Sequence, residues 1–295
     1  MRSIPVADPS MRDWRLSHGA QFEGLKIALA ASGYELADVI IEPAVGGDGP
    51  FGLQLIASAS VIAASVLDAQ SAKDLALAER RQTWRGSFAA VTPSATAALD
   101  ALRRVQPGCL FVSSNDDLAD IAALYDAASM HFLRDRHHRK ELINWMRLST
   151  SHKGYARDGL SAVAMGLGAL EAWAAGLVLG PLFDGLDRVG LAKPLLSESI
   201  KNKSAAAIVV MPKPIDEDQF DTGRHFYRLW LDFERVGLKA CPMSVLIDWD
   251  DTRQQLETRF GIGNDQTICA AFRVGIPNGK SNYPRARLPV GELLV

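Results

Sequence analysis

The most informative segment of the chain reads Arg80-Arg81-Gln82-Thr83-Trp84-Arg85-Gly86-Ser87-Phe88. A second basic segment, near the other end, reads Arg285-Ala286-Arg287-Leu288-Pro289-Val290. Both place arginines beside small or hydroxyl residues, which suits a phosphate group because a planar guanidinium donates paired hydrogen bonds and stays charged. A helix beginning near Thr83 or Phe88 would add backbone N–H groups and the positive end of its dipole. Solvated surface arginines are the commoner meaning of such clusters, so the phosphate hypothesis requires that the fold bring both segments together.

Apolar periodicity and turn residues predict a mixed pattern of helices and strands around the first basic segment. Helices are expected over residues 19–32, 72–81, 92–105, 115–145, 221–236 and 251–260. Strands are expected over residues 39–43, 109–113, 205–211 and 267–274, whereas residues 53–66 fit either a helix or a strand. Helices outnumber strands and do not alternate strictly with them. An α+β layer structure is therefore favoured over a doubly wound parallel sheet.

Local signals mark several of these boundaries. Thr92-Pro93 has the form of a helix start, with proline at the first helical position. Gly237 ends the helix 221–236 as a left-handed cap would. A crowded set of carboxylates near the predicted helix 251–260 is interpreted as its cap rather than as a metal site. The set comprises Asp248, Asp250 and Asp251.

Length, composition and charge restrict the class of protein. The chain has 295 residues, enough for one large domain or two ordinary ones. Apolar residues make up 48% and charged residues 22%, which is typical of a globular protein rather than a disordered one. The net charge of −2 argues against a nucleic-acid-binding protein, which requires a strong basic excess. The basic run 134–140 contains one acid and precedes another, so it is interpreted as a charged helix face.

Cysteine usage and hydropathy argue against several other classes. The chain has three cysteines and no Cys-x-x-Cys pair, which predicts free thiols in a reducing cytoplasm, and no metal site is expected. The N-terminus lacks the apolar core of a signal peptide. Residues 160–183 are long and apolar enough to span a bilayer, but Glu171 lies near their middle and glycines interrupt them. We therefore expect a buried helix pair there instead of a membrane span.

The basic segments and a loop between them resemble the motifs of one enzyme family. Residues 81–85 resemble the opening Arg-(x)-Ser/Thr-x-Arg/Lys motif of the FMN-dependent nitroreductases. Residues 237–244, Gly-Leu-Lys-Ala-Cys-Pro-Met-Ser, resemble the Gly-Leu-x-x-x-Pro loop that runs under the flavin ring in that family. Residues 273–277, followed by Arg285 and Arg287, resemble its C-terminal phosphate-binding segment. All three motifs occur in the order that the family has.

The chain is more closely similar to the large, dormancy-associated nitroreductase-like proteins, in which one chain holds two nitroreductase-like halves. Three short segments fit that subgroup, namely Asp8-Pro9-Ser10-Met11-Arg12, Ser17-His18-Gly19-Ala20 and Asp158-Gly159-Leu160. The resemblance implies an antiparallel-rich central sheet wrapped by helices. It also implies a truncated first half at residues 1–77 and a second half, with the flavin phosphate motifs, at 78–295. The subgroup's N-terminal Ala-Pro-Ser-x-x-Asn-x-Gln-Pro-Trp segment is not found, so part of the flavin-site wall is expected to be missing.

The resemblance further implies roles for individual residues. The residues that would hold the FMN phosphate and ribityl chain are Arg81, Thr83, Arg85, Arg285 and Arg287. Gln82 would donate to the polar edge of the flavin ring. The ring would be lined by Pro242, Met243 and Ser244, with a backbone N–H near Ser244 directed to its reactive nitrogen; the alternative interpretation of this loop is an ordinary turn. No catalytic acid–base pair is assigned, because in flavin enzymes the cofactor performs the hydride transfer.

Two hypotheses about function follow, from different classes of protein. The first is an FMN-binding oxidoreductase of the nitroreductase type, which takes a hydride from NAD(P)H and reduces nitro or quinone-like acceptors. The second is a catalytically degenerate protein that binds or sequesters flavin, and a domain without flavin is a third alternative. The retained arginines favour phosphate recognition, whereas the missing segment favours the second hypothesis. Either protein would be cytoplasmic, with a small-molecule partner and no nucleic-acid or membrane partner; a homodimer is compatible but not required.

Overall fold

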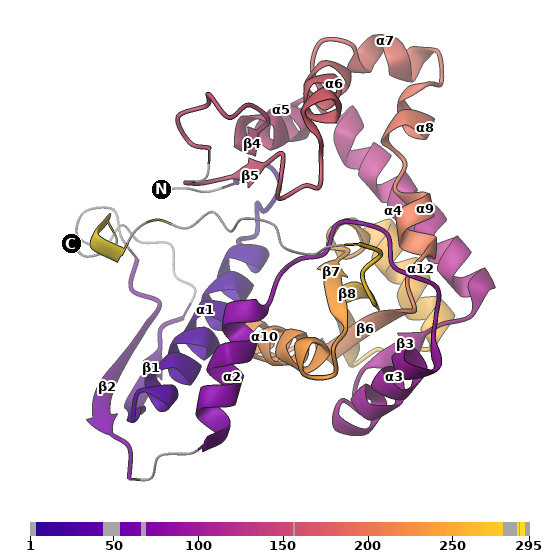
Figure 1. The fold of residues 1–295 in the computed structure, drawn as a ribbon. Helices are drawn as coiled ribbons and strands as arrows, with labels where there is room; N and C mark the ends of the chain where they lie inside the picture. Colours follow the sequence, from indigo (N-terminus) through magenta and orange to yellow (C-terminus); the bar gives the residue numbers. More distant parts are fainter. Residues whose placement is uncertain are drawn as a thin grey trace.

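The centre of the molecule is an antiparallel sheet with helices on both faces (Figure 1). The computed structural model describes residues 4–43, 54–65, 69–155, 157–279, 288 and 290–292. Within this part of the chain the central sheet has four strands in the order β3-β6-β8-β7, and all neighbouring pairs are antiparallel. The strands are β3 (Leu110–Val112), β6 (Ala207–Pro214), β7 (Lys239–Pro242) and β8 (Gln266–Gly275). The predicted α+β class, an antiparallel sheet wrapped by helices, is therefore confirmed.

Alternate residues of the central strands face two separate apolar cores. The helices on the two faces are α3 (Pro93–Val105), α4 (Asn115–Arg134), α10 (Gln219–Arg235), α11 (Val245–Asp248) and α12 (Asp250–Phe260). Val209 and Phe272 pack with α3 and α10, and the ring centroids of Phe272 and Phe233 lie 5.3 Å apart. Ile208 and Ala271 pack instead with α4, α11 and α12. Both faces of the sheet are thus covered.

Strand β6 shows why the sequence in the middle of the sheet lacks polar–apolar alternation. Its residues 207–211 are all buried, because each face of the strand meets one of the two cores. Pairing with β8 shifts register between Met211 and Pro212. A proline has no N–H to donate to a neighbouring strand, so this irregularity accommodates it inside the sheet.

A helix, a hairpin and a second helix from the first part of the chain pack beside α10 (Figure 1). They are α1 (Arg12–Ala31), β1 (Tyr34–Ile41), β2 (Ala57–Ala63) and α2 (Ala69–Arg80). The segment that fits either a helix or a strand forms β2, which pairs antiparallel with β1. The predicted boundary between residues 77 and 78 falls inside α2. The organisation into two nitroreductase-like halves stays a prediction.

Helices α1 and α10 cross with their backbones in contact. A side chain at Gly19 would collide with the carbonyl oxygen of Phe220. A side chain at Gly223 would likewise collide with the carbonyl oxygen of Leu16. Only a residue without Cβ allows this approach, so the two glycines fix how closely α1 can lie on the rest of the molecule.

Ion pairs between the same two helices stabilise the crossing. Glu23 of α1 is only 2% exposed, so its carboxylate is buried. It accepts hydrogen bonds from Arg228 at 2.7 Å and from Arg224 at 3.1 Å, both on α10. The buried Arg15 of α1 donates at 2.8 Å to Asp218, the residue that caps α10. A buried carboxylate is costly without such donors, so these pairs fix the register of α1 against α10.

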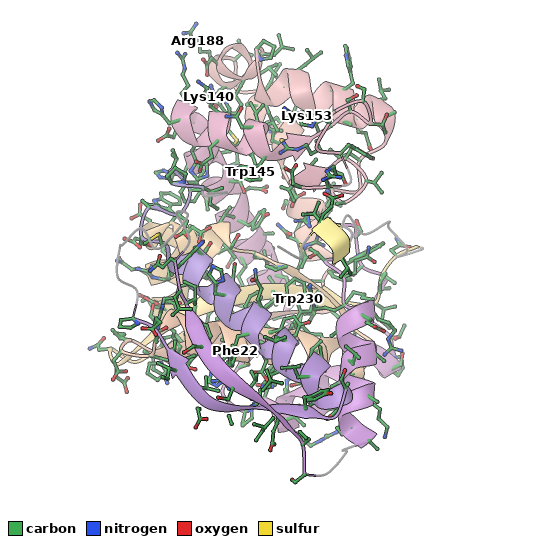
Figure 2. All side chains as sticks on the ribbon, turned by 90° about the vertical axis from the view of Figure 1, so that its left-hand side faces the viewer. Phe22, Lys140, Trp145, Lys153, Arg188 and Trp230 are labelled. Atoms are coloured by element: carbon green, nitrogen blue, oxygen red, sulfur yellow. The ribbon has the colours of Figure 1, made fainter. Side chains whose placement is uncertain are left out.

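A third region, shown at the top of Figure 1, is built from short elements. They are α5 (Arg136–Trp145), β4 (Met146–Arg147), β5 (Leu160–Ser161), α6 (Ala169–Leu179), α7 (Phe183–Arg188) and α8 (Ala192–Leu196). Below it, α9 (Ser199–Lys203) packs against α4, and η2 (Val290–Glu292) lies at the left of the view near the C-terminus (Figure 1). Figure 2 shows Trp145 between this region, with Lys140 and Lys153, and the part of the molecule that holds Phe22 and Trp230. The end of α5 therefore lies where two parts of the fold meet.

The expected buried helix pair over residues 160–183 is wrong. The segment contains β5, a turn, the single helix α6 and the first residue of α7. Leu170 and Trp173 of α6 are 76% and 65% exposed. Gly166, with a φ of 71°, and the Gly180-Pro181 pair interrupt helical structure, so the apolar run does not form one buried unit. No helix in the described part of the chain is long and apolar enough to cross a membrane.

The predicted helix over 115–145 is two helices, because the chain is extended at Asp135. The Asp135 carboxylate accepts a hydrogen bond from the backbone N–H of His137 at 2.7 Å, which caps the start of α5. The prediction of one charged helix face holds only in part, because the basic run is divided between α4 and α5. Arg134 and Arg136 are exposed and pair with Asp187 and Asp184 at 3.0 Å. Arg139 is buried and pairs with Asp184 at 2.7 Å.

Most of the predicted helix boundaries are confirmed. The Thr92 hydroxyl accepts the backbone N–H of Ala95 at 3.2 Å, and Gly237 has a φ of 81° at the end of α10. The interpretation of the carboxylate cluster as a cap is wrong for Asp248, which pairs with Arg12 of α1. Trp249 occupies the cap position of α12 instead. The local sequence could not indicate this, because Arg12 lies far away along the chain.

The close approach of α1 and α10 leads to a test of stability. Gly223→Ala should lower the free energy of unfolding by about 1–3 kcal/mol, because the new Cβ must displace the backbone of α1. Urea denaturation measures this change. Gly185→Ala is the matched control: Gly185 is helical and a Cβ there meets nothing within 4 Å. Equal stabilities of the two variants would contradict the proposed contact.

Candidate functional site

The first basic segment forms a loop that lies along the edge of the central sheet. Thr83 forms a bridge with Ala240 of β7, and the Trp84 N–H donates to the Ala240 carbonyl at 2.9 Å. Further along, Phe88 forms a bridge with Pro277, just beyond β8. Trp84 and Phe88 are both 4% exposed, so they anchor the loop by burial at two points. The residues between them are held in a defined position.

Arg273 of β8 holds this loop in position through hydrogen bonds to its backbone. Its side chain is 1% exposed and its guanidinium donates to the carbonyl of Gly86 at 2.7 Å and to that of Trp84 at 3.3 Å. Cys241 is its partner in the β7–β8 register, and the charge of Arg273 opposes the burial that raises the pKa of Cys241. Arg273 therefore ties the loop to two strands and brings a buried positive charge close to Arg85.

Five side chains from separate elements form the arginine site, as we name it here. They are Arg85 of the loop, Tyr125 of α4, Glu198 at the start of α9, Cys241 of β7 and Arg273 of β8. Burial raises the pKa of Tyr125, as does the charge of Glu198, whereas Arg273 and Arg85 act in the opposite direction. Burial likewise raises the pKa of Cys241 against the same two arginines. Because both arginines act on both groups, all five lie in one electrostatic neighbourhood.

The charge of the arginine site is not balanced by its own carboxylate. Glu198 accepts a hydrogen bond from Lys201 at 3.0 Å, and the Tyr125 hydroxyl lies 3.4 Å from its other oxygen. Within the part of the chain that the structure describes, neither Arg85 nor Arg273 forms an ion pair with a carboxylate. A buried guanidinium without an opposite charge is costly, so the site favours an anion.

A buried amide lies next to the same loop. Asn202 of α9 is 1% exposed, and among the described residues neither its amide nitrogen nor its amide oxygen has a hydrogen-bond partner. Two residues further on, the Ser204 hydroxyl accepts the N–H of Phe88 at 2.9 Å. Buried polar atoms are nearly always bonded in folded proteins, so the amide indicates a position where a ligand or water would be held.

The structure separates some of the residues that the resemblance groups together. Arg81 lies with its guanidinium 4.3 Å from the ring centre of Trp230 and 5.6 Å from that of Tyr227, both on α10. Arg85 instead lies near Cys241 and Tyr125, which pack on the α4 side of the sheet. Gln82 and Thr83 are half-buried between them. Arg285 and Arg287 lie outside the described residues, so their convergence with the loop stays a prediction.

The predicted ring-lining residues follow directly after Cys241. Pro242 ends β7 and is half-buried. The Met243 side chain is 1% exposed in the α4-side core, and its N–H donates to the carbonyl of Ala271 at 2.8 Å. Ser244 is exposed and precedes α11. A ligand over this loop would therefore meet Pro242 and Ser244, but only the backbone of Met243.

Sequence reasoning missed Tyr125, Glu198 and Asn202, because α4 and α9 carry no motif near these residues. The sequence analysis named Arg273 only as the first residue of the segment 273–277, which resembles the C-terminal phosphate-binding segment of the nitroreductases. A usable signal was present there, since an arginine inside the otherwise apolar run of β8 must have a specific partner. The partners themselves are fixed only by the folded sheet.

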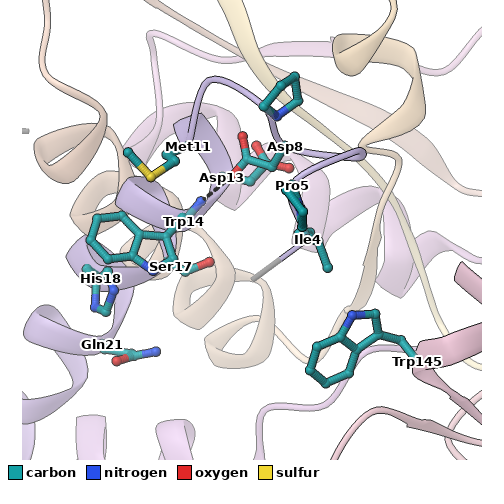
Figure 3. A pocket seen from close by; sticks show the side chains of 11 residues that line it. Ile4, Pro5, Asp8, Met11, Asp13, Trp14, Ser17, His18, Gln21 and Trp145 are labelled. Atoms are coloured by element: carbon teal, nitrogen blue, oxygen red, sulfur yellow. Dashed lines mark hydrogen bonds between the residues drawn. The ribbon is translucent and has the colours of Figure 1, made fainter. Parts of the chain in front are cut away.

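A cavity of about 740 Å³ lies at the start of α1. It is lined by Ile4, Pro5, Asp8, Pro9, Met11, Asp13, Trp14, Ser17, His18, Gln21 and Trp145 (Figure 3). Arg12, between the lining residues Met11 and Asp13, pairs with Asp248 and donates to the carbonyl of Ile247 at 3.5 Å. Both of these partners belong to α11, which begins directly after Ser244. Arg12 therefore connects the start of α1, which lines the cavity, to the segment that directly follows the predicted ring-lining residues 242–244.

Asp248 is the strongly shifted acid of this region. Burial raises the pKa of Asp248 to about 7, with the negative charges of Asp13 and Asp8 adding to the effect and Arg12 opposing it. The shift places its titration near neutral pH. No set of side chains in the described residues has the arrangement of a metal site.

Comparison with known proteins gives structural similarity only. No protein-family model matches the chain, and no curated protein matches its sequence. It is similar to the FMN-dependent nitroreductase NfnB from Mycobacterium smegmatis in complex with NADPH, with 16% identity, coverage of 76% of this chain and 96% of that chain, and a TM-score of 0.43. It is also similar to a nitroreductase with bound FMN from Bacteroides fragilis, with 10% identity, coverage of 76% of this chain and 98% of that chain, and a TM-score of 0.43. A third similar structure is an iodotyrosine deiodinase bound to FMN and 3-iodo-L-tyrosine, with 15% identity, coverage of 73% of this chain and 96% of that chain, and a TM-score of 0.42. Similarity at this level does not assign a family, so the geometry of the site must carry the functional argument.

The raised pKa of Asp248 predicts a pH dependence of stability. The folded protein keeps a proton on Asp248 where the unfolded chain has released it, so this contribution is complete below about pH 4 and is lost as the pH rises through about 7. Asp248→Asn should reduce the fall in unfolding free energy between about pH 5 and about pH 8. Asp250→Asn, at an exposed side chain on the neighbouring helix, is the control. Equal falls in wild type and Asp248→Asn would contradict the assignment.

Proposed function

We propose that this protein is an FMN-binding oxidoreductase of the nitroreductase type, which takes a hydride from NAD(P)H and reduces nitro or quinone-like acceptors. The observation that carries the proposal is the positive charge of Arg85 and Arg273 near the loop Pro242–Ser244, which no carboxylate among the described residues balances with an ion pair. A flavin mononucleotide has a phosphate dianion at one end and a planar ring at the other. The arginine site suits the first and the exposed loop suits the second.

The residues of the site fit the phosphate on physical grounds. An anion near the half-buried Arg85 would supply the opposite charge that the described residues do not provide. Arg273 would mainly hold the loop in position, because its guanidinium already donates hydrogen bonds to the carbonyls of Trp84 and Gly86. Arg285 and Arg287 are proposed as further phosphate ligands on the basis of the resemblance.

The chain's contribution to catalysis would be to bind and orient the flavin, which supplies the hydride chemistry when bound. Pro242 would limit the ring on one side. A backbone N–H near Ser244, directed at the ring's reactive nitrogen, would stabilise electron density that develops on reduction. Tyr125 and Cys241 stay protonated at neutral pH because burial raises the pKa of each, so they act as neutral neighbours of the phosphate site.

One observation favours the alternative, a catalytically degenerate protein that binds or sequesters flavin. The guanidinium of Arg81 lies over Trp230, on the α10 side of the sheet and away from Arg85. That arrangement supplies fewer phosphate contacts than the resemblance implies. We also propose, from the sequence, a small-molecule substrate, a cytoplasmic location and two nitroreductase-like halves; gel filtration would detect a homodimer.

Anaerobic spectroscopy separates the two functions. The purified protein should be yellow, and NADH or NADPH should bleach its flavin absorbance if it is an oxidoreductase. A sequestering protein would keep the flavin oxidised under the same conditions. Colourless protein that does not bind added FMN would contradict both.

The phosphate assignment predicts a selective loss of affinity. Arg85→Ala should weaken FMN binding by roughly 1.5–3 kcal/mol, because a charge-assisted hydrogen bond is lost. Calorimetric titration with FMN and with riboflavin, which lacks the phosphate, measures the difference. Riboflavin affinity should change little, and Arg136→Ala, at a surface arginine, serves as the control. Equal losses for both ligands would show that Arg85 does not recognise the phosphate.

A further inference from the structure

The cavity at the start of α1 has the size of a small-molecule site. Its volume of about 740 Å³ lies within the usual range of such sites. Apolar contributions come from Ile4, Pro5 and Met11. Trp14 and Trp145 lie on different sides of it, and they come from α1 and from the end of α5 (Figure 3). Two parts of the fold that are distant in sequence therefore enclose one space.

The charged groups in and around this cavity are predominantly acidic. Asp8 and Asp13 line it, and no lysine or arginine does so among the described residues. Asp8 is 8% exposed, and its carboxylate accepts the N–H of Trp14 at 2.8 Å. Glu141 adds a further carboxylate nearby, which accepts the N–H of Ala7 at 2.8 Å.

The cations close to the cavity are already engaged. Arg12 is shared between Asp13 and Asp248, so two carboxylates face one guanidinium. Arg15 is paired with Asp218. His18 lines the cavity, and its pKa is lowered by burial and by Arg15, so it stays neutral at physiological pH. Asp8 forms no ion pair with a described residue, so the lining keeps an acidic excess there.

The aromatic walls complement the same charge. Trp14 and His18 form an edge-on pair with ring centroids 4.3 Å apart. The guanidinium of Arg147 lies 5.7 Å from the ring centre of Trp145 while it pairs with Asp158 at 2.8 Å. An indole face attracts cations through its quadrupole, and this contact shows that Trp145 already takes part in such an interaction. Aromatic surfaces combined with carboxylates suit a flat, positively charged organic molecule.

We propose that this cavity is a binding site for an organic cation with an apolar aromatic body of two or three rings. The carboxylates of Asp8 and Asp13 provide the opposite charge, and Trp14 and Trp145 provide the faces on which the rings pack. The site is separate from the arginine site, which favours anions. It goes beyond the proposed oxidoreductase function and does not require a bound flavin.

Binding of three probes of similar size tests the charge preference. The probes are 1-methylquinolinium, a cation; 2-naphthol, a neutral molecule; and 2-naphthoate, an anion. Calorimetric titration of the purified full chain should show that the cation binds about tenfold or more tightly than the anion, with the neutral probe between them. Failure of the cation to bind, or equal or tighter binding of 2-naphthoate, would overturn the proposal.

Two variants locate the site. Asp13→Asn should weaken binding of 1-methylquinolinium by about tenfold and leave 2-naphthol nearly unchanged, because only the charge is removed. Asp100→Asn, at an exposed aspartate on α3, is the matched control and should bind all probes as wild type does. Ser17→Phe should weaken binding of all three, because its phenyl ring takes up part of the cavity. Unchanged cation affinity in either Asp13→Asn or Ser17→Phe would contradict the site, and the Ser17 variant decides if Asp13→Asn does not fold.

Discussion

The structure depends on the contact between α1 and α10. Gly19 and Gly223 let the two backbones touch, and the buried Glu23 fixes their register through two arginines of α10. Backbone contact and a buried ion pair reinforce each other here. Packing alone could slide along the helix, whereas a buried carboxylate tolerates only the register in which its donors reach it. Helix α1, and the strands β1 and β2 that pack with it, are placed on the rest of the molecule by this contact.

That placement creates the second feature of the molecule. With α1 held on α10, its first turn projects past the sheet, and Arg12 reaches Ile247 and Asp248 of α11. The cavity forms above this connection, closed on its other side by Trp145. Because α11 begins directly after Ser244, Arg12 links the start of α1 to the segment that follows the loop Pro242–Ser244.

The two sites have opposite electrostatic character. At the arginine site, positive charge is buried under the sheet-edge loop, and Arg273 is committed to holding that loop. In the cavity, the charged lining residues are the carboxylates of Asp8 and Asp13. The two sites therefore suit ligands of opposite charge.

Local sequence patterns determined the α+β class, the boundaries of α3 and α10, and the burial of β6 and β8, because caps, periodicity and apolar runs act over a few residues. They also marked Arg85 and the loop from Pro242 to Ser244 as candidates for a ligand site. Only the tertiary structure brought Tyr125, Glu198 and Arg273 close to Arg85 and placed Arg81 over Trp230. It also showed that the apolar run 160–183 contains one partly exposed helix, α6. The cavity, formed by side chains between residues 4 and 21 together with Trp145, is likewise a product of the tertiary structure. These outcomes depend on contacts between residues far apart in the chain, and no periodicity within a segment encodes which distant surface that segment will meet.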